Sequence, residues 1–192
     1  MASQFQHDKL EAMFEAFDAD RDGYLQESDF EALSARWGRL PGVEPGTELR
    51  ARVDAVCRGW WRTLLAAADT NRDNTVDMSE LLSVVDQLPT MRKEVAATAD
   101  TIFDAVDTDK DGRISPTEHQ RLVETWHGQP RETRDIFPLL DHDGDGYLTR
   151  AEFAALWIQF WISDDAAEPG NLMCGRLPGL PSPSGSPAPP QA

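Results

Sequence analysis

The chain has 192 residues, and its 34 acidic against 18 basic side chains give a formal net charge of −16. This sign excludes a protein that binds nucleic-acid phosphates and argues against attraction to an anionic membrane surface. Hydrophobic residues make up 40% of the chain, too many for a wholly disordered protein, yet no apolar run approaches the roughly 18 residues of a membrane span. No signal-peptide pattern opens the sequence, and Cys57 and Cys174 form no disulfide framework, so we expect a cytoplasmic protein.

Helical hydrophobic patterns alternate along the chain with four acidic segments of twelve residues. Apolar stripes over 10–17 and 30–37 flank the first segment, and a turn-rich linker, 38–46, follows. Stripes over 49–64 and 81–85 flank the second segment, those over 95–106 and 122–126 flank the third, and those over 136–140 and 153–161 flank the fourth. The acidic segments are loop 1 (18–29), loop 2 (69–80), loop 3 (107–118) and loop 4 (141–152).

The four loops share one pattern. Each has oxygen-bearing side chains at positions 1, 3, 5, 9 and 12, and an aliphatic residue at position 8. Sixteen of these side chains are carboxylates. The other 18 acidic residues balance the 18 basic ones, so the net charge of −16 equals the charge at these loop positions. The side chains at positions 1, 3, 5, 9 and 12 of the four loops are, in order, Asp18, Asp20, Asp22, Gln26 and Asp29; Asp69, Asn71, Asp73, Asp77 and Glu80; Asp107, Asp109, Asp111, Ser115 and Glu118; Asp141, Asp143, Asp145, Thr149 and Glu152.

This spacing is typical of a calcium-binding loop, because calcium takes six to eight oxygen ligands, preferably charged. Side chains at positions 1, 3 and 5 wrap around the ion, and the carboxylate at position 12 closes the cage. Position 7 contributes its backbone carbonyl, and position 6 turns sharply, which favours glycine. The carbonyls at position 7 belong to Tyr24, Thr75, Arg113 and Tyr147.

The four predicted sites are not equal. Loops 3 and 4 match the pattern at every position. Loop 2 has Asn74 where glycine is usual, and asparagine tolerates the left-handed conformation better than most residues. Loop 1 ends in Asp29, one methylene shorter than glutamate, which weakens calcium and favours the smaller Mg²⁺.

The pattern predicts an all-α fold of four helix–loop–helix units, paired 1 with 2 and 3 with 4. Capping boxes at Ser115–Glu118 and Thr149–Glu152 start two of the exiting helices, and Thr90 is expected to cap another. Position-8 residues of paired loops should join in short β-ladders. We expect one compact, two-lobed body: an N-terminal pair over 7–88, a C-terminal pair over 90–175, and a disordered proline-rich tail over 176–192.

These features resemble the EF-hand superfamily, and within it the sarcoplasmic calcium-binding protein and calerythrin group. The resemblance covers about residues 7–175. It includes Asp29 at the end of loop 1 and an aromatic helix followed by the segment 160–171. It implies a compact intracellular buffer or transporter of calcium rather than an enzyme. We also expect a monomer, and no protein target is evident from the sequence. Loop 2 departs from that group, because it keeps its ligands.

Two other functions stay open. A calcium sensor would expose an apolar surface to a target helix, although the five methionines do not cluster in the sequence. A small-ligand carrier similar to coelenterazine-binding proteins would hold an apolar molecule among residues such as Trp37, Trp60, Trp61 and Trp126. We expect Trp157 and Trp161 to be core residues and His119 and His127 to lie at the surface. An enzyme is disfavoured, because no nucleophile has spaced His and Asp partners.

Overall fold

The computed structural model describes residues 3–176, apart from the side chains of 88 and 89. The predicted tail, 176–192, therefore lies outside the described residues except for Arg176. The first half contains α1 (Gln4–Phe17), α2 (Glu27–Trp37), α3 (Glu48–Ala68), α4 (Met78–Ser83) and the 3₁₀ helix η1 (Val85–Met91). The second half contains α5 (Arg92–Val106), β1 (Arg113–Ile114), α6 (Pro116–His127), α7 (Phe137–Leu140), β2 (Leu148–Thr149), α8 (Arg150–Ile162) and the 3₁₀ helix η2 (Pro169–Leu172).

The loops pair as the sequence predicts. Backbone hydrogen bonds of 2.9 and 3.0 Å join Leu25 of loop 1 to Val76 of loop 2. Loops 3 and 4 meet in a two-stranded antiparallel sheet that aligns Ile114 with Leu148. All four of these position-8 side chains are fully buried, so each loop pair is anchored in the core by its apolar members.

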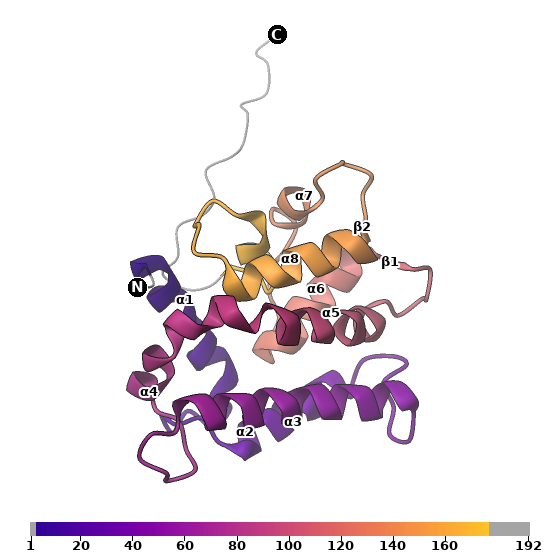
Figure 1. Cartoon of the computed structure of the whole chain (residues 1–192). Helices are drawn as coiled ribbons and strands as arrows, with labels where there is room; N and C mark the ends of the chain where they lie inside the picture. The colour runs from indigo at the N-terminus through magenta and orange to yellow at the C-terminus, as the bar shows by residue number, and fades with distance from the viewer. Residues whose placement is uncertain (1–2, 177–192) are drawn as a thin grey trace.

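The helices form a compact body in which α5 is central (Figure 1). It packs on α3 from the first half and on α8 from the second, and α2 packs on α3. Ion pairs cross this junction: Arg52 of α3 lies 2.8 Å from Asp104 of α5, and Arg150 of α8 lies 2.7 Å from the same carboxylate. Helix α5 therefore contributes to the interface between the halves, and α6 adds contacts with α1 and α2.

Aromatic side chains fill the space between the halves. The Trp126 ring of α6 lies 5.2 Å from Phe17 of α1 and 6.1 Å from Trp60 of α3, measured between ring centroids. Trp157 and Trp161 of α8 contact the same group, at 5.9 Å each from Trp126. Trp157 is fully buried and donates its indole N–H to Thr98, as expected of a core residue.

The chain between loops 2 and 3 differs from the prediction. The helix that leaves loop 2 ends at Ser83 and continues as the 3₁₀ helix η1, which contains Pro89. Proline has no backbone N–H to donate within an α-helix, which accounts for the change of helix type. Thr90 does not cap α5: Met91 precedes the helix without a side-chain hydrogen bond.

His119 and His127 are also placed differently from the prediction. His119 is fully buried and hydrogen-bonds the Met173 carbonyl at 3.0 Å, and His127 is half-buried and bonds the Cys174 carbonyl at 2.9 Å. Both contacts tie α6 to residues 163–175, which we call the C-terminal strap. At its other end, the fully buried Lys9 of α1 donates to the Ser163 carbonyl at 2.8 Å.

Candidate metal centres

Each acidic loop is folded around its first carboxylate. In every loop, one oxygen of the position-1 aspartate accepts a hydrogen bond from the backbone N–H of position 6. The donor–acceptor distances are 3.0 Å for Asp18 and Gly23, 3.1 Å for Asp69 and Asn74, 3.1 Å for Asp107 and Gly112, and 2.8 Å for Asp141 and Gly146. The four loops therefore adopt the same turn even though loop 2 lacks the glycine.

This turn requires positive φ at two positions. Position 6 has φ between 83° and 88° in the loops with glycine, and Asn74 has φ 63°, which confirms that asparagine accepts the left-handed conformation there. Position 4 is also left-handed, with φ near 60° at Arg21, Arg72 and Lys110. The sequence alone does not reveal this second left-handed position, because only loop 4 marks it with a glycine, Gly144.

Positions 5 and 7 are joined within each loop. The carboxylate at position 5 accepts from the position-7 backbone N–H at 2.8 to 2.9 Å; the pairs are Asp22 with Tyr24, Asp73 with Thr75, Asp111 with Arg113, and Asp145 with Tyr147. Position 3 likewise accepts from the N–H of position 5, through Asp20, Asn71, Asp109 and Asp143. Consecutive turns therefore place the side chains of positions 1, 3 and 5 around one centre.

The carboxylate at position 12 ties the start of the exiting helix back to the loop. Glu118 accepts from the N–H of Thr108 at 2.8 Å and from the N–H of Ser115 at 2.9 Å. The predicted capping boxes at Ser115 and Thr149 are both present. Asp77 and Glu80 form a third box, which a sequence pattern with Ser or Thr at the cap does not include.

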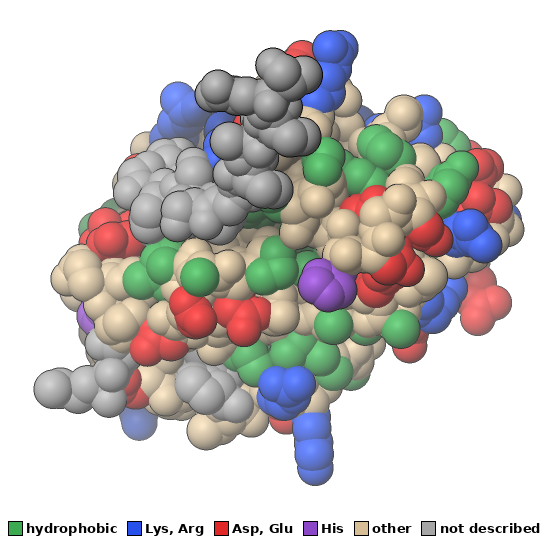
Figure 2. Space-filling model, turned by 90° about the horizontal axis from the view of Figure 1, so that it is seen from above, with side chains coloured by type: hydrophobic (Ala, Val, Ile, Leu, Met, Phe, Trp, Pro, Cys, Tyr) green, Lys and Arg blue, Asp and Glu red, His purple; other side chains and the backbone are tan. Residues whose placement is uncertain are grey.

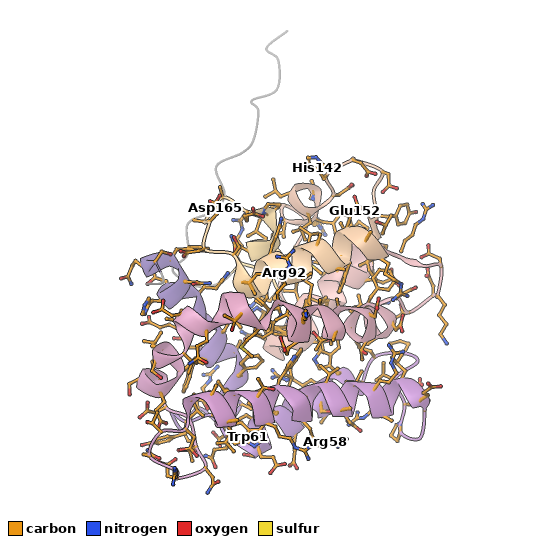
Figure 3. The ribbon with its side chains drawn as sticks, in the orientation of Figure 1. Arg58, Trp61, Arg92, His142, Glu152 and Asp165 are labelled. Atoms are coloured by element: carbon orange, nitrogen blue, oxygen red, sulfur yellow. The ribbon has the colours of Figure 1, made fainter. Side chains whose placement is uncertain are left out.

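Asp29 makes the same contacts as the longer glutamates. It accepts from the N–H of Ala19 at 3.0 Å and from the N–H of Gln26 at 2.8 Å, and its side chain is buried. The position-9 side chains face the same region: Gln26 donates to Asp22 at 2.7 Å, and Thr149 donates to Glu152 at 2.7 Å. Figure 3 shows His142 of loop 4 and Glu152 at the upper end of the molecule.

Three loops gather carboxylate oxygens closely enough for one cation. The groups are Asp18, Asp20 and Asp22; Asp107, Asp109 and Glu118; and Asp141, Asp143 and Asp145, and in each the oxygens lie within 4.8 Å of one another. Ligands on opposite sides of a calcium ion are about this far apart, given bonds of about 2.3–2.6 Å. Within residues 3–176, loop 2 forms no such carboxylate group; its third position is an amide, Asn71.

Repulsion between nearby carboxylates in loops 1 and 3 favours a bound cation. Burial raises the pKa of Asp107, and the nearby Glu118 and Asp111 carboxylates raise it further. One Asp107 oxygen, Oδ1, is buried and accepts no hydrogen bond from the described residues. Burial also raises the pKa of Asp29, helped by Asp20 and Asp18. A divalent cation satisfies the unpaired oxygen and offsets the repulsion, so these residues fit calcium. Figure 2 shows acidic side chains gathered in groups on one face.

Comparison with known families agrees with this geometry. A family model for an EF-hand domain pair matches residues 97–158, and a single EF-hand model matches residues 10–34 and 62–85. Together these matches cover more than half of the chain. The chain belongs to the EF-hand family. It is a calcium-binding EF-hand protein, and its loops 1 to 4 are four EF-hand loops in two pairs.

Individual relatives place this EF-hand protein near the sarcoplasmic calcium-binding proteins. It is 23% identical to sarcoplasmic calcium-binding proteins II, V, VI and VII of Branchiostoma lanceolatum, over 92% of this chain and 99% of the relative. Among solved structures, a Streptomyces coelicolor calcium-binding protein is 23% identical, with a TM-score of 0.67 over 82% of this chain and 98% of its own. Okadaic acid binding protein 2.1 is 18% identical, with a TM-score of 0.71 over 92% and 98%. At these levels of identity, the similarity to the two solved structures supports the fold alone.

In residues 3–176, none of the helices combines the length and the apolar character needed to cross a membrane.

Proposed function

We propose that this EF-hand protein is a calcium buffer: a cytoplasmic monomer that takes up calcium without catalysis and without an obligatory protein target. Its ligands are the side chains at positions 1, 3, 5, 9 and 12 of each loop, together with the carbonyls at position 7. In this proposal Asp29 makes loop 1 the most magnesium-tolerant site, because its shorter side chain offers calcium fewer oxygens.

One observation carries the proposal: the apolar faces of the two loop pairs are packed against each other. Trp60 of α3 lies 5.7 to 6.2 Å from Trp126, Trp157 and Trp161 of the second half. A sensor must open such a surface to a target, as calmodulin does with its Met-rich groove. Here the surface is already occupied by the other half of the same chain.

The C-terminal strap adds to this argument. Leu172, Met173 and Cys174 are buried against the second half, and the two histidine contacts hold their backbone. Within residues 3–176, the exposed large hydrophobic side chains are Tyr24 and Tyr147, both at position 7 of a loop. The described part of the chain therefore has little exposed apolar surface with which a target protein could bind.

A calorimetric calcium titration of the metal-free chain, with and without millimolar magnesium, tests the proposal. A buffer binds at about 10⁻⁹–10⁻⁸ M and weakens in magnesium, whereas sensor sites lie near 10⁻⁷–10⁻⁵ M. A dye that reports apolar surface, with calmodulin as the positive control, should gain little fluorescence on calcium addition. The buffer proposal would be wrong if calcium bound with sensor-range affinity, magnesium did not change that affinity, and the dye responded as it does to calmodulin. Those results together would indicate a calcium sensor.

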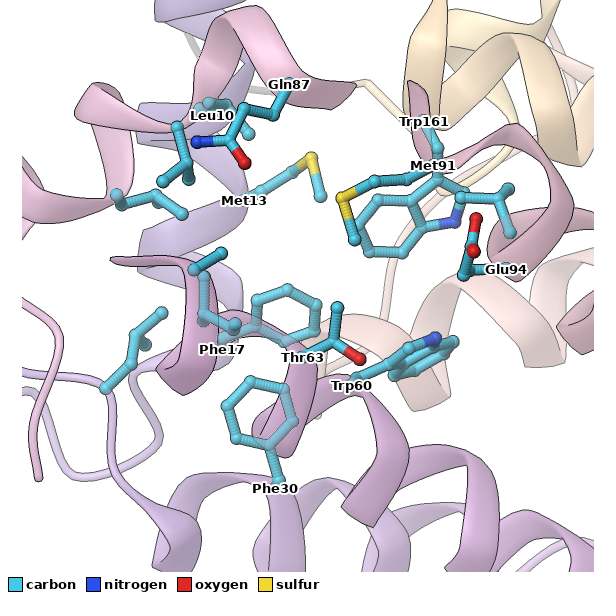
Figure 4. Close-up of a pocket in the computed structure, with 16 residues that line it drawn as sticks. Leu10, Met13, Phe17, Phe30, Trp60, Thr63, Gln87, Met91, Glu94 and Trp161 are labelled. Atoms are coloured by element: carbon cyan, nitrogen blue, oxygen red, sulfur yellow. The ribbon is translucent and has the colours of Figure 1, made fainter. Parts of the chain in front are cut away.

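A second candidate function, a carrier of a small apolar ligand, is favoured by one specific observation. An apolar cavity of about 130 Å³ opens between α1, α3, η1 and α8 (Figure 4). Met13 and Met91 face into it alongside Phe17, Trp60 and Trp161. Its lining is mostly apolar, and enclosed apolar cavities of similar size bind benzene or xenon.

The name of the structural neighbour okadaic acid binding protein 2.1 shows that this fold can accompany ligand binding. Saturation with benzene or xenon tests the carrier function. Binding that is abolished by Met13→Trp, which fills the cavity, and retained in an exposed-site control such as Arg62→Gln supports it. Equal binding by both variants would refute it.

A further inference from the structure

In three of the four loops, the carboxylate at position 12 reaches back to the start of its own loop. There it accepts a hydrogen bond from the backbone N–H of position 2. The donor–acceptor distances are 3.0 Å for Ala19 and Asp29, 3.1 Å for Thr70 and Glu80, and 2.8 Å for Thr108 and Glu118. Because position 2 follows the first ligand position, this contact brings the two ends of the loop together.

Loop 4 is arranged differently. Among the described residues, the Glu152 carboxylate accepts only from Thr149, at position 9, and no hydrogen bond joins it to His142, at position 2 (Glu152 and His142 are labelled in Figure 3). Glu118 is buried, whereas Glu152 is only partly buried. The close carboxylate group of loop 3 includes Glu118, and that of loop 4 does not include Glu152. Position 12 is therefore held near the other ligands in loop 3 but not in loop 4.

The side chain of Thr108 adds a second hydrogen bond to the same oxygen of Glu118. Its hydroxyl donates to Oε1 at 3.1 Å, and it accepts from Nη1 of Arg121, on α6, at 2.9 Å. A hydroxyl has one proton to donate, and arginine can only donate, so the proton of the hydroxyl is left for the carboxylate. The contacts from Arg121 through Thr108 to Glu118 are thus consistent in direction.

Only loop 3 among the four has every member of this series. In loop 2, the Thr70 hydroxyl also donates to Glu80 at 3.1 Å, but position 2 is Ala19 in loop 1 and His142 in loop 4. Arg121 lies three residues after position 12, and the other loops have alanine or serine there. The series is therefore a property of loop 3 and not of the shared loop pattern.

We propose that Thr108 and Arg121 are positioning residues for calcium at loop 3, which hold Glu118 in its ligand place so that the ion meets a formed site. Groups that hydrogen-bond a metal ligand fix its orientation, and their loss typically weakens metal binding by about 10- to 100-fold. A carboxylate that is already held also loses less conformational entropy when it binds the ion. This proposal rests on the calcium-ligand assignment of loop 3 in the proposed function.

The charge of Arg121 gives the positioning role and a simple charge effect opposite signs. A positive charge beside a calcium site repels the ion, so removal of the charge alone should tighten binding. Loss of a positioning contact should weaken binding. Within residues 3–176, no carboxylate lies within ion-pair distance of Arg121, so its removal leaves no anion unpaired. Lys110, exposed at position 4 of the same loop, carries the same charge and is the matched control.

A calcium titration of the full chain in chelator-buffered solution, followed by amide NMR spectra, measures loop 3 separately. The Gly112 amide reports on this loop, because it donates to Asp107 at 3.1 Å. Thr108→Val keeps the shape and removes the hydroxyl, and it should raise the calcium concentration at half-change about tenfold. Thr108→Ser should restore wild-type binding. Arg121→Met should raise this concentration about threefold, as expected for one modest hydrogen bond, whereas Lys110→Met should not raise it.

Amide hydrogen exchange in chelator gives a readout that does not depend on the ion. The Thr108 amide should be protected because it donates to Glu118, and the protection should fall in Thr108→Val and Arg121→Met. The His142 amide should exchange faster, since within residues 3–176 Glu152 makes no such contact with it. Equal exchange of the two amides in the wild-type chain would contradict the positioning of Glu118.

The remaining outcomes are distinct. Unchanged binding by Thr108→Val overturns the positioning role, and tighter binding shows that the hydroxyl competes with calcium and overturns it as well. Tighter binding by Arg121→Met, or equal weakening by Lys110→Met, removes Arg121 from the proposal. Urea denaturation in chelator should give the same midpoint for all variants; if Thr108→Val is unstable, failure of Thr108→Ser to restore binding decides against the hydroxyl. A wild-type chain that binds no calcium refutes the proposed function instead.

Discussion

The left-handed turn of loop 3 can be tested with two identical substitutions. Gly112 has φ +83°, and a Cβ built there meets nothing within 4 Å. Gly59 is exposed within α3, and its Cβ also meets nothing within 4 Å. Gly112→Ala and Gly59→Ala therefore add the same methyl group to open space and differ only in backbone conformation.

The expected effects have opposite signs. Placing alanine in a left-handed conformation costs about 1–2 kcal/mol of folded-state stability. Alanine also lowers the conformational entropy of the unfolded chain, which offsets about 0.4–1 kcal/mol of this cost. Gly112→Ala should therefore destabilise the fold by roughly 1 kcal/mol. Gly59→Ala should stabilise α3 by about 0.5–1 kcal/mol, because glycine loses more backbone entropy in a helix. The two variants should differ by close to 2 kcal/mol.

Urea denaturation at saturating calcium measures this difference, with equal m-values as the check that both variants unfold the same structure. A calcium titration then shows whether the turn serves the ion. Gly112→Ala should weaken binding at one site about fivefold, since roughly 1 kcal/mol of loop strain opposes closure. Gly59→Ala should leave every site unchanged. If the two variants shift stability equally, the backbone argument for the loops is wrong.

Three further outcomes follow from the structure. Glu118→Gln removes a charge and one oxygen at loop 3, so calcium affinity there should fall at least tenfold, or about 1.4 kcal/mol, in a titration; unchanged affinity would remove Glu118 from the ligand set. Burial lowers the pKa of His119 to about 4, below its ordinary 6.5, so the unfolded chain binds more protons between these values. Metal-free stability should fall as pH decreases from 6.5 towards 4, by up to about 1.4 kcal/mol per unit, and His119→Gln should remove that part of the slope in urea melts at several pH values. Trp126→Ala should cost about 3–5 kcal/mol, because it empties the aromatic junction of the halves; a loss below 1 kcal/mol in thermal or urea melts would contradict this packing.

Much of each candidate site could be predicted from local sequence. The loop pattern fixes its own turn, since position 1 accepts from position 6 only five residues away. The boxes at Ser115 and Thr149 and the left-handed Asn74 are likewise local, and the structure confirms them. The metal-ligand roles themselves remain predictions for the titrations above.

Contacts between distant residues could not be predicted in this way. His119 was expected at the surface because it lies near one end of a helix, yet the strap, more than 50 residues later, covers it. The buried Lys9 is explained only by the Ser163 carbonyl and Asn171. Nothing in the local pattern of either residue indicates these partners.

The sequence by itself determined the four loops and the source of the −16 charge, because short-range spacing controls both, and the order of the loops along the chain predicted their pairing. Only the tertiary structure decided what covers the apolar faces. Hydrophobic periodicity says that a helix face is buried, but it does not say against which partner. Here Trp60 meets Trp126 and Trp157 across the halves, while Lys9 and His119 find their hydrogen-bond partners in the C-terminal strap. Both results depend on long-range packing.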